Sequence, residues 1–125
     1  MDRHWHRSAH GFPRTARLNT LLQEVIAEEV RRLEDLDDRL GLITVTGVEC
    51  DPDLRRATVL LAHLDDEVAA ALEEHRRALQ SELGTQLHLR RTPALQFVAD
   101  PAIEAGERVE AALRRVVARQ RDQER

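Results

Sequence analysis

The sequence predicts a single α+β domain in which helices pack on one face of a three-stranded sheet. Three segments place apolar residues at the spacing of an amphipathic helix, and three shorter segments have the β-branched or alternating apolar residues of strands. The segments come in the order helix, strand, strand, helix, strand, helix, which is typical of a sheet with helices on one side. A length of 125 residues suits one domain.

The first helix is predicted from about residue 15, and Asp37 and Gly41 end it. Its apolar positions form one stripe: Leu18, Leu21, Leu22, Val25, Ile26, Val30 and Leu33. Residues 1–14 have no helical or strand period and contain Pro13, so we expect a flexible basic N-terminal arm there.

Two strands are predicted at residues 42–50 and 54–64, joined by a tight turn into a hairpin. Pro52 presets its backbone angle, and the aspartates on either side of it bond to their own backbone, which favours a turn. In the second strand, alternation places three side chains on one face: Ala57, Val59 and Leu61.

The second helix is predicted to begin at Asp65 and Asp66, which cap its free amides, and to end at Gly84 in a left-handed conformation. Its apolar stripe consists of Val68, Leu72, Leu79 and Leu83. Residues 86–98 read as a third strand, and Pro93 indicates a position on or near an edge of the sheet.

The last helix is predicted to start at Asp100-Pro101, because proline is favoured at the first helical position. We expect its apolar side chains to face the core: Ile103, Val109, Leu113 and Val116. Residues 118–125 are polar, so we expect a tail that frays.

Charge is distributed unevenly along the chain, whose net value is −4. Residues 1–20 carry +3, residues 21–75 carry −10, residues 76–98 carry +3, and the remainder is balanced. A phosphate backbone responds to local fields rather than to the total charge. The two basic segments are therefore compatible with RNA binding despite the acidic total.

Two extended motifs resemble the ribosome-binding factor A family. Residues 41–64, GLITVTGVECDPDLRRATVLLAHL, are similar to the hairpin signature of that family, and residues 83–100, LGTQLHLRRTPALQFVAD, are similar to its later motif. The resemblance spans about residues 15–117 and implies a type II K-homology domain that binds RNA. It also implies binding to the 16S rRNA of the small (30S) ribosomal subunit during late maturation and rRNA processing, a role in cold adaptation, and release by a ribosome-dependent GTPase.

The chain departs from the family pattern near His75-Arg76-Arg77. The family has an Ala-x-Gly kink at this place, where other K-homology domains grip nucleic acid with a Gly-x-x-Gly loop. No glycine is present here, so either the helix runs straighter or the two arginines replace backbone contacts with charge.

Arginines are the candidate RNA contacts, because guanidinium groups suit phosphates and stack on bases. The candidates are Arg76, Arg77, Arg90, Arg91, Arg55, Arg56, Arg14 and Arg17. We expect the first four to form one cluster across the junction of the second helix and third strand. The alternative for these side chains is a solvated surface, paired with carboxylates such as Glu73 or, beside the hairpin turn, Asp51 or Asp53.

Other chemistry has weaker support. In the arm, Trp5 and Phe12 among arginines suit stacking on single-stranded RNA. His4, His6 and His10 lack a Cys or acidic partner close by, so we expect no metal site and no cofactor. Cys50 and His63 lie near opposite ends of the hairpin rather than within hydrogen-bond reach, which argues against a nucleophile pair, and no other catalytic constellation is found.

The sequence therefore favours a non-enzymatic RNA-binding factor that acts as a monomer in the cytoplasm. No apolar run approaches the ~18 residues of a membrane span, no hydrophobic signal core is found, and one cysteine cannot form an internal disulfide. The alternative is a protein-interaction module that uses the acidic first helix and the exposed sheet face, without specific RNA binding.

Overall fold

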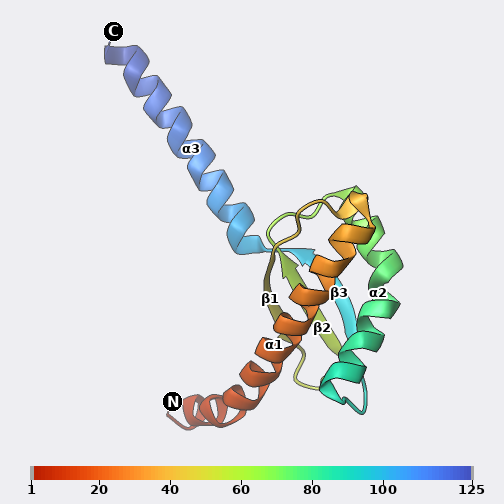
Figure 1. The fold of residues 1–125 in the computed structure, drawn as a ribbon. Coiled ribbons are helices and arrows are strands. Elements are labelled where there is room, and N and C mark those ends of the chain that lie inside the picture. Colours follow the sequence, from red (N-terminus) through yellow and green to blue (C-terminus); the bar gives the residue numbers. More distant parts are fainter. Residues whose placement is uncertain (1, 125) are drawn as a thin grey trace.

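A computed structural model describes the backbone of residues 2–124 and the side chains of residues 16–124. Residues 2–124 form seven elements, whose arrangement is drawn in Figure 1: α1 (Asp2–Leu36), the short 3-10 helix η1 (Asp38–Leu40), β1 (Val45–Cys50), β2 (Arg56–Leu61), α2 (Asp66–Leu87), β3 (Ala94–Ala99) and α3 (Pro101–Glu124). The predicted α+β class and the predicted order of helices and strands are confirmed.

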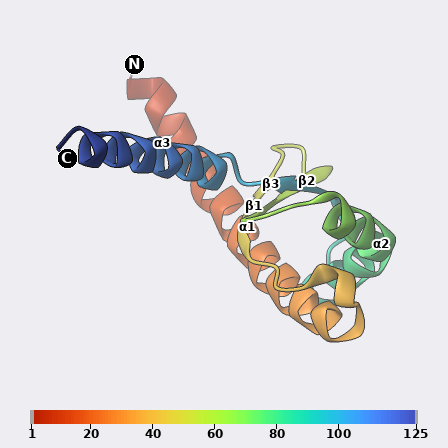
Figure 2. The ribbon, with the colours of Figure 1, turned by 90° about the horizontal axis from the view of Figure 1, so that it is seen from above.

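The three strands form one sheet in the order β1-β2-β3. β1 and β2 pair antiparallel, with Cys50 opposite Ala57, which confirms the hairpin. β2 and β3 pair parallel, with Arg56 opposite Ala94. Parallel neighbours need a crossover, and α2 provides it. In the view from above in Figure 2, α1 and α2 lie on the same side of the sheet.

The core lies between the sheet and these two helices. Ala57, Val59 and Leu61 are fully buried, as the alternation in β2 predicts. Helical spacing supplies the facing stripes, which are Leu22, Ile26 and Val30 from α1 and Leu72, Leu79 and Leu83 from α2. Leu40 of η1 and Leu95 of β3 complete the packing at 2% and 4% exposure.

α2 begins as predicted but ends later. The Asp65 side chain accepts a hydrogen bond from the Val68 backbone N–H, at 2.8 Å, and caps the helix. The prediction that Gly84 ends it is wrong, because the helix continues to Leu87 and His88 adopts the left-handed conformation. A Cβ at Gly84 would lie 2.6 Å from the Thr92 hydroxyl oxygen, so this glycine allows close packing rather than a cap.

The later helix end also shortens the third strand. Leu87 belongs to α2 and Leu89 to the connection, so the predicted strand at residues 86–98 is observed only at Ala94–Ala99. Alternation of leucines about Pro93 suggested a longer strand. The last turn of α2 and the short connection to β3 space their leucines in the same alternating way as a strand would.

α3 extends away from the rest of the molecule (Figure 1). The prediction that its apolar side chains face the core is wrong, since the helix buries no residue. Ile103, Val109, Leu113 and Val116 are 36–58% exposed. Periodicity identifies an apolar stripe but not what the stripe packs on, and α1 and α2 already cover the helical face of the sheet. Asp100 holds the start of α3 by accepting from the Thr46 hydroxyl at 2.6 Å and from the Ala102 N–H at 2.9 Å.

α1 begins at Asp2, so the structure has helix at residues 2–14 where the sequence indicated an arm without regular structure. That prediction rested on the absence of a helical or strand period, on Gly11, and on Pro13, which has no N–H for a helical hydrogen bond. α3 likewise continues through residues 118–124. Within residues 2–124, none of the helices combines the length and apolarity that crossing a membrane requires.

Candidate nucleic-acid interface

One end of the sheet brings together arginines from two distant segments. Parallel pairing of β2 with β3 places the starts of both strands side by side, with the Ala94 N–H donating to the Arg55 carbonyl at 2.9 Å. Arg55 and Arg56 therefore lie beside the connection that carries Arg90 and Arg91, just before β3. All four side chains are exposed.

The segment of α1 around Asn19 lies at the same end of the sheet. The Cys50 backbone N–H, at the end of β1, donates to the Asn19 side chain at 2.9 Å. Arg17 is two residues before Asn19 and is exposed. We call this end of the molecule, with its five exposed arginines, the basic end: Arg17, Arg55, Arg56, Arg90 and Arg91.

The basic end is only lightly neutralised. Arg55 lies 4.0 Å from Asp53, with its side chain 72% exposed, so this pair is weak. Among residues 16–124, no carboxylate lies within 4.0 Å of the other four guanidinium groups. Glu49, Asp51 and Asp53 are the acidic residues of the adjoining hairpin, which leaves the end net positive.

Arg76 and Arg77 lie further along α2, which is unbroken through the position of the family kink. Arg76 is paired with Glu73 at 2.7 Å, as the solvated-surface alternative proposed, whereas Arg77 is exposed. Thr92, which follows Arg91, lies against Gly84 of α2. Gly84 comes seven residues after Arg77, so the two positions are about 10 Å apart along the helix axis at ~1.5 Å per residue. The four arginines therefore form two pairs, Arg76-Arg77 on α2 and Arg90-Arg91 on the connection from α2 to β3.

Carboxylates gather at the opposite end of the molecule, around the start of α2 and the end of α1. This acidic end consists of Asp37, Asp38, Asp65, Asp66, Glu67 and Glu74. Arg39 lies among them and contacts both Asp37 and Glu74 at 2.6 Å. Hydrogen bonds from Arg39 and then His75 hold the pKa of Asp37 well below its usual range, and Arg39 also lowers the pKa of Glu74.

A third set of arginines was not predicted, because residues 99–125 balance in charge. Arg108, Arg115 and Arg119 follow one another at seven- and four-residue spacing on α3, which places them along one side of the helix. Among the arginines of α3 that the structure describes, only Arg114 lies within ion-pair distance of a described carboxylate, that of Glu110 at 4.0 Å. These three arginines are found when charged residues are counted along one face of the helix instead of over a whole segment of the chain.

Cys50 and His63 lie at opposite ends of the hairpin formed by β1 and β2. His63 lies 3.6 Å from Glu107 beyond the far end of β2, whereas Cys50 is 8% exposed beside Asn19, so the two do not meet. Among the described residues, no three potential ligands are grouped as a metal site. The side chains of Arg14, Trp5, Phe12 and the three N-terminal histidines lie outside the described residues.

Comparison with known proteins supports the resemblance seen in the two motifs. A family model described as ribosome-binding factor A matches residues 14–113. A protein named ribosome-binding factor A from Rubrobacter xylanophilus is 42% identical over 108 residues, covering 82% of this chain and 87% of the relative. One of that name from Acidothermus cellulolyticus is 38% identical, covering 87% and 75%.

Solved structures give the same answer for the fold. The crystal structure of ribosome-binding factor A from Thermus thermophilus is similar with a TM-score of 0.63 at 31% identity, covering 68% of this chain and 94% of that one. A T. thermophilus homology model fitted into a cryo-EM map of a 30S–RbfA complex matches with a TM-score of 0.56 at 31% identity, covering 65% and 89%. Together with the family model and the sequence relatives, these matches show that the chain belongs to the ribosome-binding factor A family.

Proposed function

We propose that this chain binds the small ribosomal subunit through its ribosomal RNA, as a factor in late subunit maturation and rRNA processing. The observation that carries the proposal is the basic end, where three separate segments place five exposed arginines at one end of the molecule, with one weak ion pair between them and the described carboxylates. A T. thermophilus relative fitted into the map of a 30S complex supports the same partner. The alternative of a module without RNA binding is not favoured by these relatives.

The arginines of α2 and of the basic end form the proposed contact surface. Arg90 and Arg91 are exposed on a short connection, so their guanidinium groups can each meet a phosphate. Arg77 extends this surface along α2, and Arg76 joins it by exchanging Glu73 for a phosphate. Arg14, Trp5 and Phe12 are proposed to extend it onto single-stranded RNA through stacking.

Further properties are proposed from family membership alone. We propose that the chain acts by binding rather than catalysis, without a cofactor, and as a monomer. We also propose that it works in the cytoplasm, supports growth in the cold, and is displaced by a ribosome-dependent GTPase.

Co-sedimentation with purified small subunits tests the proposal. Arg90→Glu/Arg91→Glu reverses two charges at the basic end, and we expect it to weaken binding at least tenfold. Arg31→Glu/Arg32→Glu is the matched control, because it makes the same change on the far half of α1 at exposed positions. Equal binding by wild type and the folded Arg90/Arg91 variant would remove the basic end from the proposal.

A further inference from the structure

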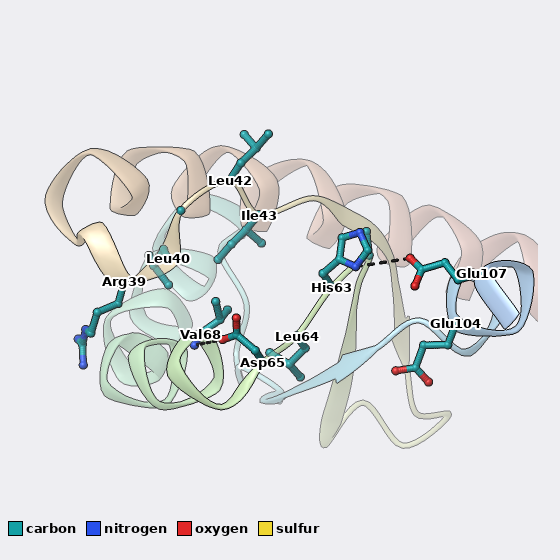
Figure 3. A pocket seen from close by; sticks show the side chains of 12 residues that line it. Arg39, Leu40, Leu42, Ile43, His63, Leu64, Asp65, Val68, Glu104 and Glu107 are labelled. Atoms are coloured by element: carbon teal, nitrogen blue, oxygen red, sulfur yellow. Dashed lines mark hydrogen bonds and ion pairs between the residues drawn. The ribbon is translucent and has the colours of Figure 1, made fainter. Parts of the chain in front are cut away.

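A cavity of about 500 Å³ opens at the acidic end, where the body of the protein meets the base of α3. Three segments line it: the chain from η1 into β1, the connection from β2 to α2, and the first turns of α3. Figure 3 shows their side chains around the hollow. None of the arginines of the basic end contributes to it.

The floor of the cavity is apolar. Ile43, Leu64 and Val68 line it while packing on the core from the other side, so the floor is backed by rigid structure. Leu42 stands at the rim with 91% of its surface exposed. An apolar floor with a rigid backing is the arrangement that receives an anchoring side chain of a partner.

The wall of the cavity is negatively charged. Glu104 and Glu107 from α3 line the side of the hollow away from α2, with Glu107 directed toward His63, and Asp65 borders it from the start of α2 (Figure 3). Of the two basic groups in the lining, Arg39 is already bound by Asp37 and Glu74, and His63 lies 3.6 Å from Glu107. Asp65 caps α2 through the Val68 N–H and Glu107 lies near His63, but the three carboxylates of the lining outnumber its one arginine, so the lining is net negative around an apolar surface.

We propose that this cavity is a docking groove for a basic protein segment with an apolar anchor residue, carried by a protein of the small ribosomal subunit. The anchor packs on Ile43, Leu64 and Val68, and the flanking Lys or Arg side chains meet Glu104 and Glu107. The choice of a ribosomal protein rests on the proposed function. The basic charge and the apolar anchor follow from the groove itself.

The same charges argue against other occupants. Phosphates of RNA or of an anionic lipid surface would be repelled by Asp65, Glu104 and Glu107. The groove and the basic end lie at opposite ends of the sheet, because β2 starts at the basic end and leads into the groove through His63 and Leu64. One molecule can thus meet RNA at one end and a basic protein segment at the other.

Binding of the full chain to overlapping 15-residue peptides that cover the proteins of the small subunit tests this proposal. We expect peptides that combine several Lys or Arg with a large apolar residue to bind, with fluorescence anisotropy giving their affinities. Glu104→Arg/Glu107→Arg should weaken the binding of these peptides at least tenfold, and Leu42→Ser, which removes apolar surface without adding charge, should weaken it severalfold. Asp122→Arg/Glu124→Arg makes the same charge change at the other end of α3 and should alter affinity less than twofold.

Several results would overturn the proposal: no peptide binding, preference for acidic peptides, or affinities unchanged in Glu104→Arg/Glu107→Arg. So would a dimer in sedimentation that Glu104→Arg/Glu107→Arg abolishes, which would make a second copy the occupant. Because the peptide measurement contains no ribosomal RNA, it can fail while wild type still co-sediments with subunits. In that case the proposed function stands and the groove proposal does not.

Discussion

The backbone N–H of Leu95 donates to the side-chain oxygen of Gln80 at 3.0 Å, which ties the outer edge of β3 to α2. The preceding N–H, of Ala94, donates to the carbonyl of Arg55, just before β2, so alternation turns the Leu95 N–H away from the sheet. The bond holds α2, which carries Arg76 and Arg77, against the start of β3, which follows Arg90 and Arg91 in the chain. It also covers part of an edge that would otherwise present a free donor.

Gln80→Ala should lower the free energy of unfolding by about 1–2 kcal/mol, because it leaves the partly buried Leu95 N–H without its partner. Urea unfolding followed by circular dichroism measures this change. Gln96→Ala, at an exposed position of β3, is the control and should change stability by less than about 0.5 kcal/mol. Equal stability of the two variants would show that the Gln80 bond contributes nothing.

Gly84→Ala should destabilise the protein by about 1–3 kcal/mol despite the better helix propensity of alanine, because the new Cβ meets the Thr92 hydroxyl at 2.6 Å. Thr92→Ala removes that oxygen, and the Thr92 Cβ lies at an ordinary 3.9 Å. The double variant should therefore recover most of the loss in a double-mutant cycle of unfolding free energies. Additive losses would contradict the close approach.

Asp37 should make stability depend on acid pH. Its pKa is held below the ordinary value of 3.8 by Arg39 and His75, so the folded state favours the ionised carboxylate. This stabilisation is fully present above about pH 5 and is lost as pH falls through the folded pKa. Thermal unfolding of wild type and Asp37→Asn between pH 2 and pH 6 should show the largest difference at pH 6. A difference that stays constant over this range would contradict the prediction.

Cys50 should be an unreactive thiol in the native protein. Burial, with smaller contributions from Asp51 and Asp53, raises its pKa, and the side chain is 8% exposed, so thiolate is scarce at neutral pH. We expect alkylation by iodoacetamide at pH 7.5 to be slow in the folded protein and at least tenfold faster in ~6 M urea. Equal rates in both conditions would contradict the placement of this residue.

Local sequence signals predicted the elements that pack on one another. The alternation in Ala57, Val59 and Leu61 identified the buried face of β2, and Asp65 identified the start of α2. Such signals depend on neighbours in the chain, whose geometry a helix or strand fixes. They failed at Gly84, whose role depends on contact with Thr92, and at Leu113, whose stripe has no partner within the described chain.

The candidate surface was predicted only in part for the same reason. Arg90 and Arg91 were identified as basic neighbours, but their approach to Arg55 and Arg56 depends on the parallel register of β2 and β3. Sequence spacing does not reveal that register. Likewise, the cavity at the acidic end is lined by three segments between residues 39 and 107, and none of these segments has a distinctive sequence motif.

The central claim is that phosphates occupy the basic end, and the salt dependence of small-subunit binding tests it most directly. Each neutralised phosphate releases counterions, so the logarithm of the binding constant falls linearly with the logarithm of salt concentration. Between about 50 and 200 mM salt we predict a steep slope for wild type, reduced by roughly 0.7–0.9 for each contacting arginine removed in Arg55→Ala/Arg56→Ala/Arg90→Ala/Arg91→Ala. A wild-type slope near zero, or an unchanged slope in the folded quadruple variant, would contradict the account.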